Sequence, residues 1–163
     1  MMTVFTFLFG AMVGSFLNVC IHRLPKEESI VAPRSRCPAC RLAIRPWDNI
    51  PLLSFVLLRG RCRDCGHPIS WRYPLVEALT AILFATTVSR YGVTPRSVTL
   101  LVFLSALVAI AFIDLDHQII PNVITLPGIP LGLLAGLALG EPPLLDRVIG
   151  TLVGAGFLYL VLF

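Results

Sequence analysis

The sequence has 163 residues, of which 56% are apolar and only 13% are charged, and its mean hydropathy is +0.86. Since an average soluble domain is roughly half apolar and about a quarter charged, this composition excludes disorder and argues against a water-soluble globule. The charges are segregated: 10 of the 13 lysines and arginines lie between Arg23 and Arg72, and residues 98–113 carry none. We therefore assign the basic excess, 13 − 9 = +4, to membrane topology and expect no nucleic-acid partner.

The first apolar run, residues 2–21, has 20 residues without a charge, and at 1.5 Å per residue it covers about 30 Å, one hydrocarbon thickness. Basic residues follow this run instead of preceding it, so it is predicted to stay attached as a helix and not to be cleaved as a signal peptide. Further apolar runs at 74–91, 98–113, 123–140 and 148–163 bring the total to five spans. The prediction is an all-α, polytopic membrane helix bundle with a small polar loop after the first span.

The basic loop fixes the predicted orientation, because positive residues near span ends stay in the cytoplasm. The loop is then cytoplasmic, the N-terminus lies outside, and the 114–122 connection returns to the cytoplasmic side. We divide the chain into a first transmembrane helix (1–21), a cytoplasmic tetracysteine loop (22–73) and a membrane region with four further helices (74–163). The last run, 148–163, covers about 24 Å, some 6 Å short of a bilayer core. Gly150 and Gly154 have the spacing of a helix-packing motif, although ordinary glycine tolerance explains them equally well.

Four of the five cysteines form two Cys-x-x-Cys pairs, Cys37 with Cys40 and Cys62 with Cys65. This spacing is close to that of a structural zinc site, and the neighbouring arginines favour the thiolates that zinc needs. A reducing cytoplasm disfavours the alternative of disulfides, and a redox centre would need only one pair. The helix bundle is therefore predicted to carry a small cytoplasmic zinc-knuckle loop. Cys20, in the first span, is interpreted as a small buried apolar residue.

Asp114 and Asp116 stand at the cytoplasmic end of the uncharged third span. Carboxylates at a membrane boundary are candidates for function, and a pair of them can perform aspartic protease chemistry. On a helix these two would lie about 200° apart, so a second aspartate from another helix is needed for a catalytic pair. A solvated helix end is the equally weighted alternative, and His117 is expected to face water.

Several longer motifs occur in order along the chain and together resemble the bacterial type IV prepilin leader peptidase family. They are Gly14-Ser15-Phe16-Leu17-Asn18-Val19, His22-Arg23-Leu24-Pro25, Pro33-Arg34-Ser35-Arg36 with the first cysteine pair, Asn49-Ile50-Pro51-Leu52-Leu53-Ser54, the second cysteine pair, Ile69-Ser70-Trp71-Arg72-Tyr73-Pro74-Leu75-Val76-Glu77, and Asp114-Leu115-Asp116-His117-Gln118-Ile119-Ile120-Pro121-Asn122.

The resemblance implies a membrane aspartic endopeptidase in the bacterial inner membrane. It would remove the leader of type IV prepilins and pseudopilins at the cytoplasmic face. It also implies that Asp114 is catalytic, that the four cysteines hold zinc, and that some members methylate the new N-terminus with S-adenosylmethionine. Asp116, Glu77 and Asn18 are accessory candidates: Glu77 for pairing with Arg72 or the interface, and Asn18, like Ser15, for a substrate groove or an interhelical hydrogen bond.

One departure from the family pattern is the missing Gly-x-Gly-Asp motif, which carries the second catalytic aspartate. Asp146 cannot replace it, since the topology places that residue outside. We therefore expect the sequence to be incomplete at its C-terminus and inactive as a protease by itself. The alternatives are a non-catalytic zinc-bearing membrane or interaction protein and, less strongly, a membrane methyltransferase without protease activity, which lacks a glycine-rich dinucleotide-type fingerprint.

Overall fold

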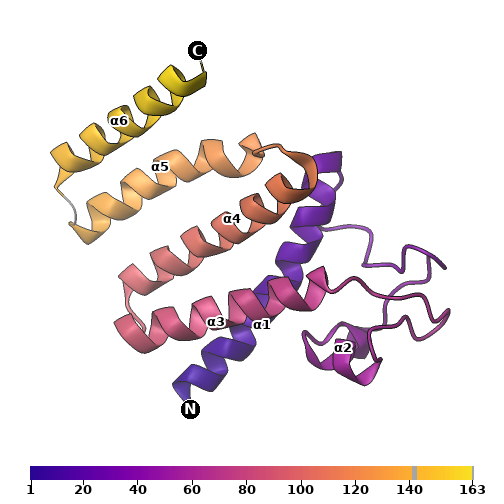
Figure 1. Cartoon of the computed structure of the whole chain (residues 1–163). Helices are drawn as coiled ribbons and strands as arrows, with labels where there is room; N and C mark the ends of the chain where they lie inside the picture. Colours follow the sequence, from indigo (N-terminus) through magenta and orange to yellow (C-terminus); the bar gives the residue numbers. More distant parts are fainter. Residues whose placement is uncertain (141–142, 163) are drawn as a thin grey trace. The chain divides into compact units, whose positions relative to one another are not determined.

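The computed structural model describes residues 1–140 and 143–162 and contains helices as its regular elements there, so the all-α prediction is confirmed. Figure 1 shows their order along the chain. The elements are α1 (Met2–Arg23), η1 (Leu24–Lys26), η2 (Pro46–Asn49), α2 (Leu53–Leu57), α3 (Arg72–Tyr91), α4 (Pro95–His117), α5 (Asn122–Leu139) and α6 (Leu144–Leu162).

Three of the described helices are long and apolar enough to cross a membrane, namely Met2–Lys26, Pro95–His117 and Asn122–Leu139. They correspond to the first, third and fourth predicted spans. The second and fifth spans stay predictions: α3 carries Arg72, Glu77 and Arg90, and Phe163 at the end of the fifth lies outside the described residues. The fifth helix begins at Leu144, four residues earlier than predicted, because Asp146 and Arg147 fit into its first turn. Its 19 residues cover about 28 Å, but the added first turn carries Asp146 and Arg147, so the uncharged run still begins at residue 148.

The chain divides into two compact units, Met1–Pro121 and Asn122–Phe163. In the first unit, α1 crosses α3 at close range (Figure 1). A Cβ atom at Gly14 would lie 2.7 Å from the Glu77 Cα and 3.0 Å from the Val76 carbonyl oxygen, and one at Gly10 would lie 2.8 Å from the Ala81 Cα. The small-x-x-x-small spacing that lets helices approach closely is therefore used at Gly10 and Gly14.

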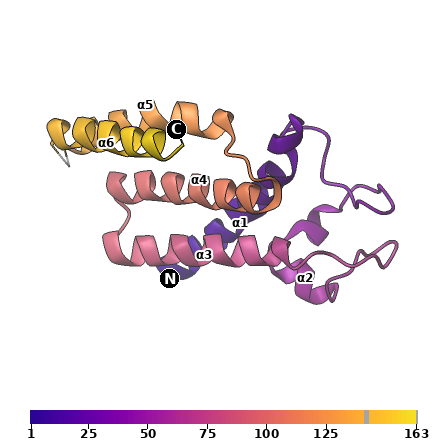
Figure 2. The same ribbon diagram turned by 45° about the horizontal axis from the view of Figure 1, so that its top comes forward.

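α3 and α4 form an antiparallel hairpin, and Figure 2 shows them side by side. The turn between them follows from local sequence: Gly92 ends α3 with φ +68°, and Pro95 starts α4. Thr94 and Ser97 make a capping box that satisfies free backbone N–H groups at the start of α4.

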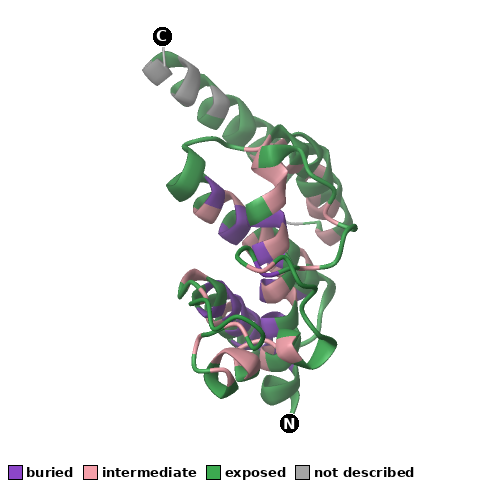
Figure 3. Cartoon of the chain, turned by 90° about the vertical axis from the view of Figure 1, so that its right-hand side faces the viewer, coloured by how far each residue is buried: buried purple, intermediate pink, exposed green. Residues whose placement is uncertain are grey.

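The core of the first unit lies where α1, α3 and α4 meet. Burial is concentrated on these helices (Figure 3). The most buried apolar side chains are Ile21, Val76, Ala81, Ala109 and Ile113. The arrangement brings the end of α1, the start of α3 and the end of α4 to the same end of the unit, next to the loop between α1 and α3.

The second unit is a helical pair. α5 contains Pro127 and Pro130 and is closed by Gly140, whose φ is +70°. The Arg147 side chain of α6 packs over Gly136 of α5, where an added Cβ would lie 3.1 Å from the guanidinium. Among the described residues nothing lies within 4 Å of an added Cβ at Gly150 or Gly154.

Candidate active site and metal centre

The two cysteine pairs lie on two turns with the same backbone hydrogen bonds. In the first, the Arg41 N–H donates to the Cys37 carbonyl at 2.9 Å and the Cys37 N–H to the Leu42 carbonyl at 3.0 Å. In the second, the Gly66 N–H donates to Cys62 at 2.9 Å and the Cys62 N–H to His67 at 2.8 Å. An isolated antiparallel bridge closes each turn, Arg36 with Ala43 and Arg61 with Pro68.

Each turn requires a left-handed residue directly after its second cysteine. Gly66 fills this position with φ +71°, and Arg41 fills the equivalent one with φ +61°. Glycine adopts this conformation without steric cost, whereas a side chain such as that of arginine meets a penalty. The two turns therefore have the same backbone conformation, but the left-handed position costs conformational free energy at Arg41 and not at Gly66.

The four thiols converge on one point, with the Sγ atoms of Cys37, Cys40, Cys62 and Cys65 all within 4.8 Å of one another. The Cys37 and Cys65 sulfurs are 3.8 Å apart. A tetrahedral ion with metal–sulfur bonds of about 2.3 Å needs sulfurs about 3.8 Å apart, so the cluster fits a metal bound by four thiolates. Such an ion would have no open position for catalysis, and its role would be to join the two turns.

The thiols differ in how readily they ionise. The Cys40 backbone N–H, which stabilises the thiolate, lowers the pKa of Cys37 to about 7. At Cys65 the His67 backbone N–H acts in the same direction, but desolvation and the other three thiols outweigh it and raise the pKa to about 11. A bound cation would remove this opposition, because it favours every thiolate around it.

Residues 35–70, which contain the four cysteines, are called the cysteine module. Two ion pairs join its segments. Arg63 holds Asp48 through both carboxylate oxygens at 2.6–3.0 Å, and Arg45 contacts Asp64 at 3.2 Å. Each pair links the first half of the module to the second. The Arg63 guanidinium lowers the pKa of Asp48, which keeps this carboxylate ionised.

The module is attached to the helices through Glu77. The Leu52 backbone N–H donates to Glu77 Oε2 at 2.8 Å, and the glutamate is only 8% exposed. Pairing with Arg72 was one of the two roles considered for Glu77, and in the structure Arg72 forms its ion pair with Asp116 instead. Glu77 therefore binds the loop backbone from a position one and a half turns inside α3.

Asn18 makes the interhelical hydrogen bond that was one of its two predicted roles. Its Nδ2 donates to the Tyr73 carbonyl at 3.1 Å, which joins the end of α1 to the start of α3. The residue is 4% exposed, and its Oδ1 is buried with no hydrogen-bond partner among the described residues. Cys20, two residues further on, is buried as predicted.

Both aspartates of the acidic segment lie within the last turn of α4, at the end of the unit that holds the cysteine module. Asp116 forms an ion pair with Arg72, and this joins the end of α4 to the start of α3. Asp114 is exposed and takes part in no ion pair that the structure describes, and His117 is exposed as expected. Since α4 stays helical through His117, the two carboxylates diverge by about 200° and cannot form a catalytic pair together.

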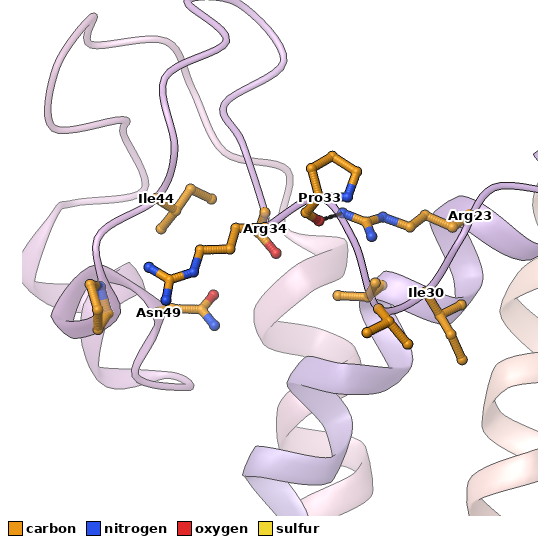
Figure 4. A pocket seen from close by; sticks show the side chains of 10 residues that line it. Arg23, Ile30, Pro33, Arg34, Ile44 and Asn49 are labelled. Carbon is orange, nitrogen blue, oxygen red and sulfur yellow. Dashed lines mark hydrogen bonds between the residues drawn. The ribbon is translucent and has the colours of Figure 1, made fainter.

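A cavity of about 280 Å³ lies between the end of α1 and the loop that follows it (Figure 4). Arg23 donates across its wall to the carbonyls of Ser29 at 2.7 Å and Pro33 at 2.6 Å. Arg34 lines the cavity from another side, beside Asn49. Sequence reasoning did not single out this cavity, because its walls come from segments that no single motif contains.

Comparison with known proteins gives two family matches that together cover most of the chain. Residues 8–91 match the Bacterial Peptidase A24 N-terminal domain, and residues 101–163 match the Type IV leader peptidase family. No solved structure matches the chain.

Several curated relatives carry the name prepilin leader peptidase/N-methyltransferase, among them the following three. That of Myxococcus xanthus is 52% identical over 93% of this chain and 45% of its own length. That of Bacillus subtilis is 42% identical over 94% and 61%, and that of Neisseria gonorrhoeae is 39% identical over 93% and 62%. The chain spans about half to three fifths of the length of these relatives. With both family matches and an all-helical fold that carries a four-cysteine cluster, the chain belongs to the peptidase A24 family of type IV leader peptidases.

Proposed function

We propose that this chain supplies one half of the active site of a membrane aspartic endopeptidase that removes the leader of type IV prepilins and pseudopilins. The observation that carries the proposal is the position of Asp114, exposed in the last turn of α4 within the segment that matches the leader peptidase family. The names of the relatives support the choice of substrate.

The two aspartates of α4 have different roles in this proposal. Asp116 is neutralised by Arg72 and fixes the end of α4 against α3. Asp114 is left to act on the substrate together with a second carboxylate, as peptide hydrolysis by a carboxyl pair requires. No Gly-x-Gly-Asp motif occurs among the 163 residues, so we assign the second carboxylate to a segment outside them.

Such a pair hydrolyses a peptide bond with one proton shared between the two carboxyl groups. The ionised carboxylate takes a proton from water as the water oxygen attacks the scissile carbonyl. The protonated carboxyl group gives its proton to the carbonyl oxygen, which yields a gem-diol intermediate. As this intermediate collapses, the carboxyl group that took the water proton gives it to the leaving nitrogen, the other carboxylate takes a proton from a gem-diol hydroxyl, and the amine of the mature protein is released. The substrate's own apolar helix would enter from the bilayer, which presents the cleavage site at the level of Asp114.

The test compares two neighbouring carboxylates in a full-length protein containing this chain, with a prepilin as substrate. Asp114→Asn should lower the cleavage rate on the order of 1,000-fold or more, because it removes a group that moves a proton. Asp116→Asn breaks a partly exposed ion pair worth up to about 1 kcal/mol, so the rate should fall less than about tenfold. Undiminished cleavage by the Asp114 variant would refute the proposal.

A second candidate is favoured by the missing motif: the 163 residues on their own form a non-catalytic, metal-bearing membrane protein that binds an assembly component. Cleavage of prepilin by the 163-residue chain itself would refute this alternative. Binding of an assembly component by the 163-residue chain, without cleavage of prepilin, would support it.

We also propose that the ion held by Cys37, Cys40, Cys62 and Cys65 is structural zinc, which the sulfur geometry and the four-thiolate donor set support. The relatives' name supports a second activity, methylation of the new N-terminus with S-adenosylmethionine. Metal analysis of the purified chain tests the zinc, with one equivalent expected, and transfer of a labelled methyl group to a cleaved pilin tests the methylation. If no labelled methyl group is found on the cleaved pilin, the proposed methylation is refuted and only the peptidase activity remains proposed.

The proposed location is the bacterial inner membrane, with the N-terminus outside, segment 22–73 in the cytoplasm and segment 74–163 as the peptidase region of four further helices. The three apolar helices support insertion, and the excess of arginine in the loop supports its sidedness. Reporter fusions after residues 60 and 93 should report opposite sides of the membrane. Fusions that report the same side would show that α3 does not span.

A further inference from the structure

The short helix α2 presents an apolar face that the rest of the first unit leaves uncovered. Its three outward residues are Leu53, Val56 and Leu57, which are 51%, 70% and 70% exposed. They have the spacing i, i+3, i+4 and so lie on one side of the helix. Phe55, in contrast, packs against the Trp71 ring with centroids 4.8 Å apart, so the other side of α2 is held to the start of α3.

The depth of α2 follows from its attachment to Glu77. The Leu52 N–H, directly before α2, donates to Glu77 at 2.8 Å. Glu77 is five residues beyond Arg72, and at 1.5 Å per residue this is about 7.5 Å along the axis of α3. Arg72, with its ion pair to Asp116, marks the polar end of these helices. In the proposed topology, in which α3 spans the membrane, this places the start of α2 at the depth of an interfacial helix, whose apolar face lies about 5–10 Å into the boundary between headgroups and acyl chains.

The charges beside α2 indicate what kind of partner its apolar face contacts. Arg59 and Arg61 follow the helix directly, both are exposed, and neither has an acidic partner among the described residues. Apolar side chains flanked by unpaired guanidinium groups match the boundary between acyl chains and anionic headgroups. An acidic soluble partner would match the arginines but would leave the face of Leu53, Val56 and Leu57 unexplained.

We propose that α2 is an interfacial anchor that inserts Leu53, Val56 and Leu57 into the bilayer leaflet next to the cysteine module, with Arg59 and Arg61 at anionic phospholipid headgroups. The anchor holds the module against the membrane at the level of the helix ends. It is independent of catalysis, so it holds whether or not the proposed peptidase activity is found.

The test uses tryptophan as a depth probe, since Trp47 and Trp71 are the only tryptophans in the chain. Both are replaced by phenylalanine in the full 163-residue chain loaded with zinc, and Val56→Trp is added as the probe. The control probe in the same background is Leu42→Trp, an exposed aliphatic position in the first cysteine turn. The proteins are placed in phosphatidylcholine vesicles with 30% phosphatidylglycerol, and one equivalent of bound zinc verifies folding.

The anchor predicts that bromine on the upper acyl chain quenches the Val56→Trp probe at least about twofold more than the Leu42→Trp probe, while acrylamide does the reverse. Brominated phosphatidylglycerol should quench the first probe more than an equal fraction of brominated phosphatidylcholine, and Arg59→Gln with Arg61→Gln should remove this excess. Equal bromine quenching of both probes, or strong acrylamide quenching at Val56→Trp, would overturn the insertion. Equal quenching by the two brominated lipids would overturn the preference for anionic headgroups.

Discussion

The contact between α1 and α3 at Gly14 leads to a prediction whose size follows from the structure. A Cβ atom there would lie 2.7 Å from the Glu77 Cα, 3.0 Å from the Val76 carbonyl oxygen and 3.2 Å from the Thr80 Cβ. Ordinary contacts begin at 3.4 Å, so the helices must separate by about 3.4 − 2.7 = 0.7 Å, because two of the three neighbours are backbone atoms. Gly14→Val adds two further methyl groups to the same space.

Overpacking of this kind costs about 1–3 kcal/mol. The higher helix propensity of valine returns only a few tenths of a kcal/mol. At about 1.4 kcal/mol per factor of ten, Gly14→Val should raise the population of separated α1 and α3 by about 5- to 140-fold. Cys20, which is buried on α1, reports that opening through its rate of alkylation in detergent.

Mass spectrometry of the peptide that contains Cys20 separates its labelling from that of the other cysteines. The matched control is Gly150→Val, because nothing described lies within 4 Å of a Cβ at that position. The control should label at the rate of the unchanged chain. The reasoning is refuted if Gly14→Val labels at that rate too, since the two backbones would then not be in contact.

The remaining predictions concern the cysteine module. Arg41→Gly should stabilise the metal-loaded module by up to about 1 kcal/mol, because glycine adopts φ +61° freely, and Gly66→Ala should destabilise it by a similar amount. Competition with a chelator measures the metal affinity of each variant. Metal affinities equal to that of the unchanged chain would contradict the comparison of the two turns. The pKa of the Asp48 carboxyl group, followed by ¹³C NMR, should lie below its ordinary value, and Arg63→Gln should raise it toward that value. Since the folded pKa is the lower one, the pair stabilises the module at neutral pH, and this contribution is lost as the pH falls below about 4 through the folded pKa. Removing the metal with a chelator should increase amide hydrogen exchange across residues 35–70, while the α1 and α3 amides keep their protection. Equal exchange before and after chelation would show that the two cysteine turns do not depend on the ion.

The sequence by itself determined the main apolar helices and the four-cysteine cluster. The apolar runs predicted the α1, α4 and α5 spans to within a few residues, because a helix in hydrocarbon satisfies its own backbone and needs only length and composition. The spacing of the four cysteines predicted the cluster, because each Cys-x-x-Cys turn is local. The start of α6 was missed by four residues, since a charged first turn looks like a loop when only hydropathy is considered.

The tertiary structure decided which partners those elements chose. By sequence, both Glu77 and Asp116 could pair with Arg72. The end of α4 packs next to the start of α3, so Arg72 pairs with Asp116, 44 residues away in the sequence. Glu77 instead accepts a hydrogen bond from the Leu52 backbone. The close crossing likewise uses Gly10 and Gly14, whereas the same spacing at Gly150 and Gly154 has no described neighbour. Such choices depend on which helix faces cross and at what depth, and a motif records spacing along one helix but not the surface that meets it.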